Sequence, residues 1–369
     1  WSTSLVGGVL LSGLLSSCSQ PAVIQSPRLP TTAKIAKSQT VVFIHGMFVT
    51  PSCWEKWEPY FQAKGYKTLA PAWPEHDRPV DEQRKLGGRL AALTLDEVLE
   101  RYRKVIRELG PENPPILIGH SMGGLIVQLL LQEGLGAAGI AIDSAPPKGV
   151  ISLKYSFLKS NWPAISATAK IDEPIVLSQD DWNYAFANCV SADEQQSSFA
   201  RYAVPESRRV GKGPTTDVAK INYEHARPPL LMIAGELDHI IPASLNRKNY
   251  SKYESTSSIT DFREFPGRCH YIIGQSGWEE VADYTLEWIK NNEPGEAELQ
   301  EQVLLSKQFP LQPLISVLTP VYNTPPDMLE LTIRSLLAQT YENWELVLAD
   351  GGSTRAATRE TLLKFGRSD

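Results

Sequence analysis

The feature that most constrains this chain is residues 115–131, where a short apolar run ends in Gly-His-Ser-Met-Gly and a second apolar run follows at once. The first run has the length of a buried strand, and the second favours a helix. A Gly-x-Ser-x-Gly motif between a strand and a helix is the pattern of a nucleophile elbow, which exposes the hydroxyl of Ser121 on a tight turn. Side chains at Gly119 and Gly123 would collide across that turn, so glycine is expected at both positions.

Five further stretches are candidates for strands, and segments that favour helices alternate with them. These stretches occupy residues 40–44, 66–70, 139–142, 230–234 and 260–265. Thr94 and Glu97 form a capping-box pattern that opens a helix to about Leu109. Strands that alternate with helices predict a doubly wound, mostly parallel six-stranded sheet of the α/β class.

The alternation lapses between residues 146 and 228. This stretch carries aromatic residues such as Trp182, Tyr184 and Phe186 among helix-forming and polar segments. Because ligands lie at the carboxyl ends of the strands in such sheets, we predict a helical cap over the site. The alternative is an excursion that only covers one side of the sheet.

Ser121 needs partners, because a hydroxyl is a poor nucleophile at neutral pH without a base and an acid that orients the base. Three histidines follow it in the chain: His225, His239 and His270. His270 lies in the loop after the last strand run, where the fold can bring it to Ser121, and it is the favoured base. His225 falls at the end of the cap region, and His239 directly follows an aspartate, so both are weaker candidates.

The favoured acid is Asp238, in the turn that follows the strand run 230–234. Asp143, which ends the run 139–142, remains its rival, and Glu236 is a weaker candidate. Each aspartate also has a structural interpretation, because Asp143 could cap the start of the cap region and Asp238 the helix expected from Pro242.

Two backbone N–H groups are expected to stabilise the oxyanion that forms during acyl transfer. One belongs to Met122, directly after the nucleophile, and the other to Met47, in the loop after His45-Gly46. We expect His45 to hold that loop by hydrogen bonds and His120 to be structural.

Taken together, residues 40–289 resemble a cap-bearing α/β-hydrolase, through the elbow, the His45-Gly46 loop, the turn at 235–238 and the late histidine. The resemblance implies Ser121 as nucleophile, His270 as base and Asp238 as acid, in a serine hydrolase that cleaves carboxylic esters, thioesters or amides without cofactor or metal. Proteins of this fold also include lyases and acyltransferases, so a non-hydrolytic enzyme is the alternative.

The net charge and the cysteine spacing bear on which ligands and cross-links to expect. The formal net charge of −6 argues against nucleic acid as a main partner. Cys53, Cys189 and Cys269 show neither the spacing of a metal site nor a disulfide framework, so we predict three ordinary thiols.

The first 39 residues are expected to be a leader and linker. Residues 5–15 are small and apolar, and Leu15-Ser16-Ser17-Cys18 resembles a bacterial lipobox, in which the cysteine is lipidated. This pattern predicts a lipoprotein of the bacterial cell envelope, tethered to a membrane through Cys18. Without it we expect a cytoplasmic protein.

After a hydrolase domain over 40–292 and a connector over 293–309, residues 310–369 predict a separate β-α-β unit. Its Pro320-Val321-Tyr322-Asn323 stretch and the turn at Asp350 resemble the opening of family-2 GT-A glycosyltransferases. Gly351 stands where such enzymes usually carry a second acidic residue, and one β-α-β unit buries too little surface to be secure alone. We therefore expect a truncated or fused fragment. A sugar-nucleotide binder is the alternative.

Overall fold

The computed structural model describes residues 38–110, 113–152, 154–165, 170–253, 258–292, 304–337, 341 and 343–365. The predicted lipidation site at Cys18 and most of the predicted connector lie outside these residues. None of the described helices has both the length and the apolar character that crossing a membrane requires.

The core is one six-stranded sheet in the order β2-β1-β3-β4-β5-β6, in which every neighbouring pair is parallel. This confirms the predicted fold class and the number of strands. The strands are β1 (Thr40–Ile44), β2 (Lys67–Leu69), β3 (Ile116–His120), β4 (Ala138–Ile142), β5 (Leu230–Gly235) and β6 (Thr260–Phe265). The central strands β3, β4 and β5 are buried along their whole length, as their uninterrupted apolar sequences predict.

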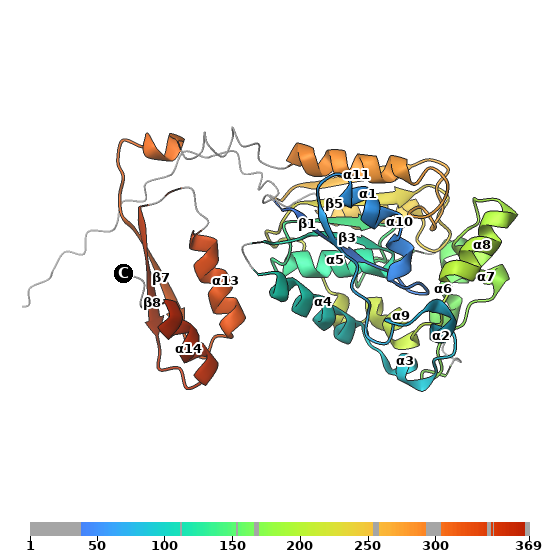
Figure 1. Ribbon diagram of the computed structural model, residues 1–369, viewed down its shortest axis with the longest axis horizontal. Helices are drawn as coiled ribbons and strands as arrows, with labels where there is room; N and C mark the ends of the chain where they lie inside the picture. Colours follow the sequence, from blue (N-terminus) through green and yellow to red (C-terminus); the bar gives the residue numbers. More distant parts are fainter. Residues whose placement is uncertain are drawn as a thin grey trace, which may run out of the picture. The chain divides into compact units, whose positions relative to one another are not determined.

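Helices cover both faces of the sheet, as Figure 1 shows: α1 and α11 lie on one face and α4 and α5 on the other. Their bounds are α1 (Trp57–Gln62), α4 (Leu95–Leu109), α5 (Met122–Gln132) and α11 (Glu279–Asn292), while α10 (Ala243–Tyr250) packs on β5 and β6. Four short helical segments lie in the connections between these elements, namely η1 (Pro51–Trp54), α2 (Val80–Gln83), α3 (Gly88–Ala92) and η4 (Ser251–Tyr253).

The two helices beside the elbow form for different reasons. Helix α4 begins at the predicted capping box, in which Thr94 Oγ1 accepts from the backbone N–H of Glu97 while the Glu97 carboxylate accepts from the N–H of Thr94. Its buried residues form one apolar stripe. Helix α5 is buried on all sides, and its one polar residue before the last turn, Gln128, donates to Ser144 Oγ at 2.6 Å. The sheet, α4 and the segment of α10 and η4 that bonds Gln128 thus surround the helix that begins after Ser121.

Between β4 and β5 the chain forms a group of helices that Figure 1 shows together at one end of the sheet. They are α6 (Tyr155–Ile165), α7 (Gln179–Ala185), α8 (Ala192–Tyr202), α9 (Arg208–Lys212), η2 (Gly213–Thr215) and η3 (Asp217–Ala219). Trp182 is fully buried and stacks on Phe186, with ring centroids 4.2 Å apart, so this region has an aromatic core of its own. We refer to it below as the cap.

A disulfide joins Cys189 of the cap to Cys269, with Cα atoms 5.7 Å apart and a sequence separation of 80. The prediction of ordinary thiols at both positions is therefore wrong. Only Cys53, which is buried, is a free thiol in the part of the chain that the structure describes. Spacing along the chain did not reveal the pair, because the two loops meet only after the cap has folded onto the sheet.

The C-terminal residues form a small unit with its own apolar cluster. Strands β7 (Ile315–Val321) and β8 (Trp344–Asp350) pair in parallel, with α13 (Pro326–Leu337) between them and α14 (Ala356–Phe365) after them. Val321, Leu329 and Ile333 are its buried apolar residues. The β-α-β unit predicted from the sequence is present.

Candidate active site

Ser121 occupies a strained turn between β3 and α5. Its backbone lies at φ 59° and ψ −119°, a conformation with positive φ that non-glycine residues rarely adopt. A β-carbon on Gly119 would lie 2.2 Å from the carbonyl oxygen of Gly123, and one on Gly123 would lie 2.1 Å from the carbonyl oxygen of Ile44. The turn therefore requires glycine on both sides of the serine. The predicted collision across the turn accounts for Gly119, while Gly123 must be glycine because strand β1 passes close to it.

Asp238 and His270 form a buried pair. Nδ1 of His270 donates to Oδ2 of Asp238 at 2.7 Å, and both side chains are fully inaccessible. The second carboxylate oxygen of Asp238 accepts the backbone N–H groups of Ile240 and Ile241, at 2.7 and 2.8 Å. Asp238 thus makes bonds within its own loop and does not cap helix α10, whose N-cap residue is Pro242. The carboxylate is oriented and stabilised by three donors.

The loop that carries His270 lies against the elbow. Nε2 of His120, the residue before the serine, donates to the carbonyl oxygen of His270 at 2.8 Å, and the two imidazole rings are 4.6 Å apart. Burial lowers the pKa of His120 well below its usual value, so it is neutral and structural, as expected. The edge of His270 also meets the Phe186 ring from the cap, at 4.9 Å.

Nε2 of His270 is buried and has no hydrogen-bond partner among the described residues, so the structure does not contain a Ser121–His270 hydrogen bond. A ring nitrogen in this state can accept a proton. In unliganded enzymes the bond between nucleophile and base is often long and tightens only when substrate binds.

The two expected oxyanion donors belong to residues next to Ser121, one directly after it in the chain and one in the loop after β1. The β-carbon that an alanine would place at Gly46, one residue before Met47, would be 2.7 Å from Cβ of Ser121, so this loop passes directly over the nucleophile. Neither the N–H of Met47 nor that of Met122 donates to another group within the described part of the chain. Both residues line the cavity at Ser121.

A cavity of about 780 Å³ opens at Ser121 between the sheet and the cap. Its lining is mainly apolar and comes from both parts, including Met47, Phe48, Met122, Ile151, Phe157, Leu158, Leu177, Tyr184, Phe186, Ile240 and Ile241. Ser121 thus lies at the wall of a mainly apolar chamber, which has the size of a typical small-molecule site.

The rival site residues lie elsewhere or have other partners. His225 is exposed, and Nδ1 of His239 bonds the carbonyl oxygen of Tyr184, which ties its loop to the cap. Asp143 is fully buried beside Asp238, but Oδ1 accepts the N–H of Gly235 instead of reaching Nδ1 of His270. His270 is therefore bonded to Asp238, while Asp143 is bonded to the backbone of β5.

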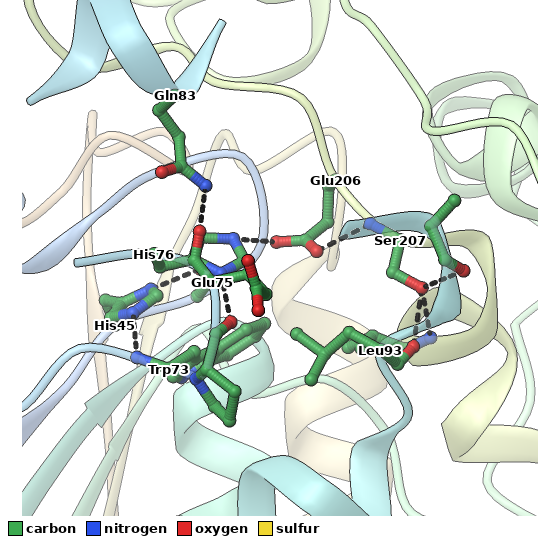
Figure 2. Close-up of polar contacts among 12 residues, drawn as sticks. His45, Trp73, Glu75, His76, Gln83, Leu93, Glu206 and Ser207 are labelled. Carbon is green, nitrogen blue, oxygen red and sulfur yellow. Dashed lines mark hydrogen bonds and ion pairs between the residues drawn. The ribbon is translucent and has the colours of Figure 1, made fainter. Parts of the chain in front are cut away.

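A buried polar network lies beside the loop of Met47, and Figure 2 shows its members. Nε2 of His45 accepts the N–H of Trp73, on whose ring it also stacks, so His45 holds this loop as expected. Next to it, Nε2 of His76 bonds the Glu206 carboxylate of the cap at 3.1 Å, with both side chains inaccessible. Burial by itself lowers the pKa of His76, but the Glu206 charge raises it above its usual value overall. Sequence reasoning missed this link, because neither residue stands in a recognisable motif.

One group of side chains in the described residues has the composition of a metal site. Ligand atoms of His120, Asp143 and His270 all lie within 4.8 Å of one another. Nδ1 of His270 is bonded to Asp238, so His270 could bind a metal only through Nε2. That is the nitrogen which a proton-transfer role would require to be free. The donor set therefore fits a proton-transfer site better than a resident ion.

Two parts of the chain match known protein families, and several known proteins resemble it. Residues 41–284 match the alpha/beta hydrolase family, and residues 316–368 match glycosyl transferase family 2. A Mycoplasma genitalium protein whose name assigns it to the esterases and lipases is 27% identical over 234 residues, which make up 60% of this chain and 76% of that protein. The solved monoacylglycerol lipase of Paleococcus ferrophilus has the same fold, with a TM-score of 0.50 at 18% identity over 70% of this chain and 98% of its own.

A further relative matches a short stretch only. The uncharacterized protein y4gI of Sinorhizobium fredii is 47% identical over 57 residues, which are 15% of this chain. The match spans 6% of the length of that protein.

Proposed function

Because the chain belongs to the alpha/beta hydrolase family, we propose that it is a serine hydrolase that cleaves a carboxylic ester through an acyl-enzyme on Ser121. The observation that carries the proposal is the Asp238–His270 pair. Nδ1 of His270 is bonded to the carboxylate at 2.7 Å, Nε2 is left without a partner, and the loop lies against the residue before the serine. A base oriented in this way can activate a hydroxyl.

In the proposed reaction, Nε2 of His270 takes the hydroxyl proton as Oγ of Ser121 attacks the acyl carbon. The negative charge passes to the carbonyl oxygen, which accepts hydrogen bonds from the N–H groups of Met47 and Met122. Each such donor typically contributes about 3 kcal/mol to the barrier reduction. The imidazolium, stabilised by Asp238, then protonates the leaving alkoxide. Water repeats the sequence on the acyl-enzyme and releases the carboxylic acid.

The cavity supports an ester with an apolar acyl or alkyl portion. Its walls are mainly aliphatic and aromatic, and its volume is about 780 Å³. Transfer of apolar surface from water into such a chamber gives about 25 cal/mol per Å². We therefore expect kcat/KM to rise with acyl length until the chamber is filled and to fall beyond that point.

The test is covalent labelling with a fluorophosphonate probe, together with turnover of a p-nitrophenyl ester series on the purified chain. We expect the wild type to be labelled and to release p-nitrophenol, and Ser121→Ala to do neither. Ser197→Ala is the matched control, because Ser197 is exposed on the cap helix α8 and its hydroxyl only donates to the carbonyl of Glu194. Labelling that persists in Ser121→Ala would refute the nucleophile. A labelled wild type that releases no acyl group would favour the non-hydrolytic alternative.

A further inference from the structure

Asp143 is a buried carboxyl group that the proposed mechanism does not use. It ends β4 with a backbone φ of 42° and is wholly inaccessible. Its own N–H donates to the carbonyl oxygen of Ile233 at 2.8 Å, and Oδ1 accepts the N–H of Gly235 at 2.7 Å. Both bonds lead to the neighbouring strand β5, so the position of this side chain is set by the sheet.

The other carboxyl oxygen of Asp143 has no donor. Oδ2 is buried and accepts no hydrogen bond from the described residues. An unsatisfied anionic oxygen in such a place is costly, whereas a protonated oxygen can itself donate. Burial raises the pKa of Asp143 well above its usual value, and the adjacent negative charge of Asp238 raises it further. Both the burial of the unpaired oxygen and the neighbouring charge thus favour the protonated form of Asp143.

The groups that face Asp143 come from three strand ends. They are His120 from β3, Asp238 from the loop after β5 and His270 from the loop after β6. Nε2 of His120 donates to a carbonyl oxygen and Nδ1 of His270 donates to Asp238, while Nδ1 of His120 and Nε2 of His270 are buried and have no partner among the described residues. Among these groups the adjacent Asp238 carboxylate is the charged acceptor, and a hydrogen bond to a charged oxygen is stronger than one to an uncharged ring nitrogen.

We propose that Asp143 is a positioning residue, a neutral carboxylic acid whose Oδ2–H donates to the Asp238 carboxylate while its Oδ1 accepts the N–H of Gly235. This assignment deepens the proposed function and rests on it. The bond anchors Asp238 from the side opposite its own loop, so that Oδ2 of Asp238 stays aimed at Nδ1 of His270. Asp238 is the charged partner of the base, and Asp143 acts through it.

The experiment compares Asp143→Asn, Asp143→Gly and Asp238→Asn in ester turnover. Asparagine keeps one donor and one acceptor without charge, so its kcat should stay within a factor of about three of the wild type. Glycine removes the carboxyl and suits a positive φ, and it should lower kcat by about 10- to 100-fold with little change in KM, the range for losing a hydrogen bond to a charged group. Asp238→Asn should lower kcat by about 10⁴-fold, as for a mis-oriented base.

A second readout does not depend on turnover. The Nδ1–H proton of His270, bonded to Asp238, should give a low-field ¹H NMR resonance in the wild type and in Asp143→Asn, and this resonance should be lost or displaced in Asp143→Gly. Asp143→Ser supplies a second variant without the carboxyl should the glycine variant not fold. If no ester is cleaved, the proposed function fails while the resonance still reports on Asp143.

Two results would overturn the proposal. A decrease of kcat in Asp143→Asn as large as that in Asp238→Asn would mean that Asp143 must be charged for turnover. Wild-type kcat together with an unchanged resonance in the variants without the carboxyl would mean that Asp143 only fills space.

Discussion

At the scale of single residues, the elbow leaves no space for a β-carbon on either glycine beside Ser121. The added atom would meet backbone oxygen at 2.2 Å for Gly119 and 2.1 Å for Gly123. Backbone atoms cannot swing aside as the end of a flexible side chain can, so the strand or the helix would have to move.

We predict that Gly123→Ala destabilises the fold by about 3 kcal/mol or more and removes ester turnover, because over-packing against backbone exceeds the usual range for core positions. Gly88→Ala is the matched control, since a β-carbon at Gly88 meets nothing within 4 Å. The measurements are urea unfolding and ester turnover on both variants. A Gly123→Ala protein with wild-type stability and rate would show that the turn is not as tight as described.

Asp143 and Asp238 have identical side chains but differ in the number of hydrogen-bond donors around them. Asp238 has three donors to its carboxylate, while Asp143 has one donor and a buried oxygen without any. Two adjacent carboxyl groups cannot both ionise cheaply, so the one with fewer donors retains its proton.

At the scale of elements, the cap is attached to the loop that carries the base. Cys189 is bonded to Cys269, directly before His270, and the N–H of Tyr271, directly after it, donates to the carbonyl oxygen of Phe186 at 2.9 Å. The cap thus holds the chain on both sides of His270. A substitution in the cap can therefore shift the imidazole of His270 even where the substituted residue does not line the cavity.

We predict that reduction of this disulfide with dithiothreitol lowers the free energy of unfolding by about 2–4 kcal/mol, the usual range for a cross-link that closes a long loop. The measurement is urea unfolding of the oxidised and reduced protein, with ester turnover followed in parallel. Cys189→Ser is the control, and it should be less stable than the oxidised wild type and insensitive to the reductant. Equal stability of the oxidised and reduced wild type would contradict the prediction.

The capping box at the start of helix α4 should contribute less to stability than the disulfide. Thr94 and Glu97 satisfy each other's backbone N–H groups at this helix N-terminus. We predict that Thr94→Ala costs about 1 kcal/mol of stability and leaves kcat unchanged, because α4 lies outside the cavity. Unfolding curves and turnover of the variant check this, and an effect below 0.2 kcal/mol would show that solvent replaces the cap at no cost.

At the scale of the whole molecule, the cap and the sheet domain share a buried ion pair, His76–Glu206, beside the stacked rings of His45 and Trp73 (Figure 2). The pKa of His76 is raised in the folded protein, so the pair contributes its full stabilisation below the ordinary histidine pKa of about 6.5 and loses it as the pH rises through the folded value. The pKa of His45 is lowered by burial, and that group acts in the opposite sense, destabilising as the pH falls.

We predict that Glu206→Gln destabilises the protein by about 3–5 kcal/mol near pH 6, as expected for breaking a buried pair, and by clearly less near pH 9. Comparing the variant with the wild type at each pH separates His76 from His45, which is present in both. Thermal or urea unfolding between pH 6 and 9 measures the difference. A difference that is constant over this range, or that grows with pH, would exclude a charged His76 in the folded state.

Local sequence determined much of this protein by itself. The run of strands and helices, the glycines around Ser121, the capping box at Thr94 and the β-α-β unit near the C-terminus all follow from periodicity and turn chemistry within a few residues, and the structure contains each of them. Such features are readable because the interactions that cause them act between near neighbours in the chain.

Only the tertiary structure decided which distant groups meet. It pairs Cys189 with Cys269, joins His76 to Glu206 across 130 residues, and gives Asp238 and not Asp143 to His270. These contacts depend on how the cap folds back onto the sheet and on which strand ends lie side by side. For the disulfide and the His76–Glu206 pair, neither the residue types nor their spacing carries that information, because burial and proximity arise only when the whole chain has packed. For His270 the sequence favoured Asp238 but left Asp143 open, and the packing of the strand ends decided between them.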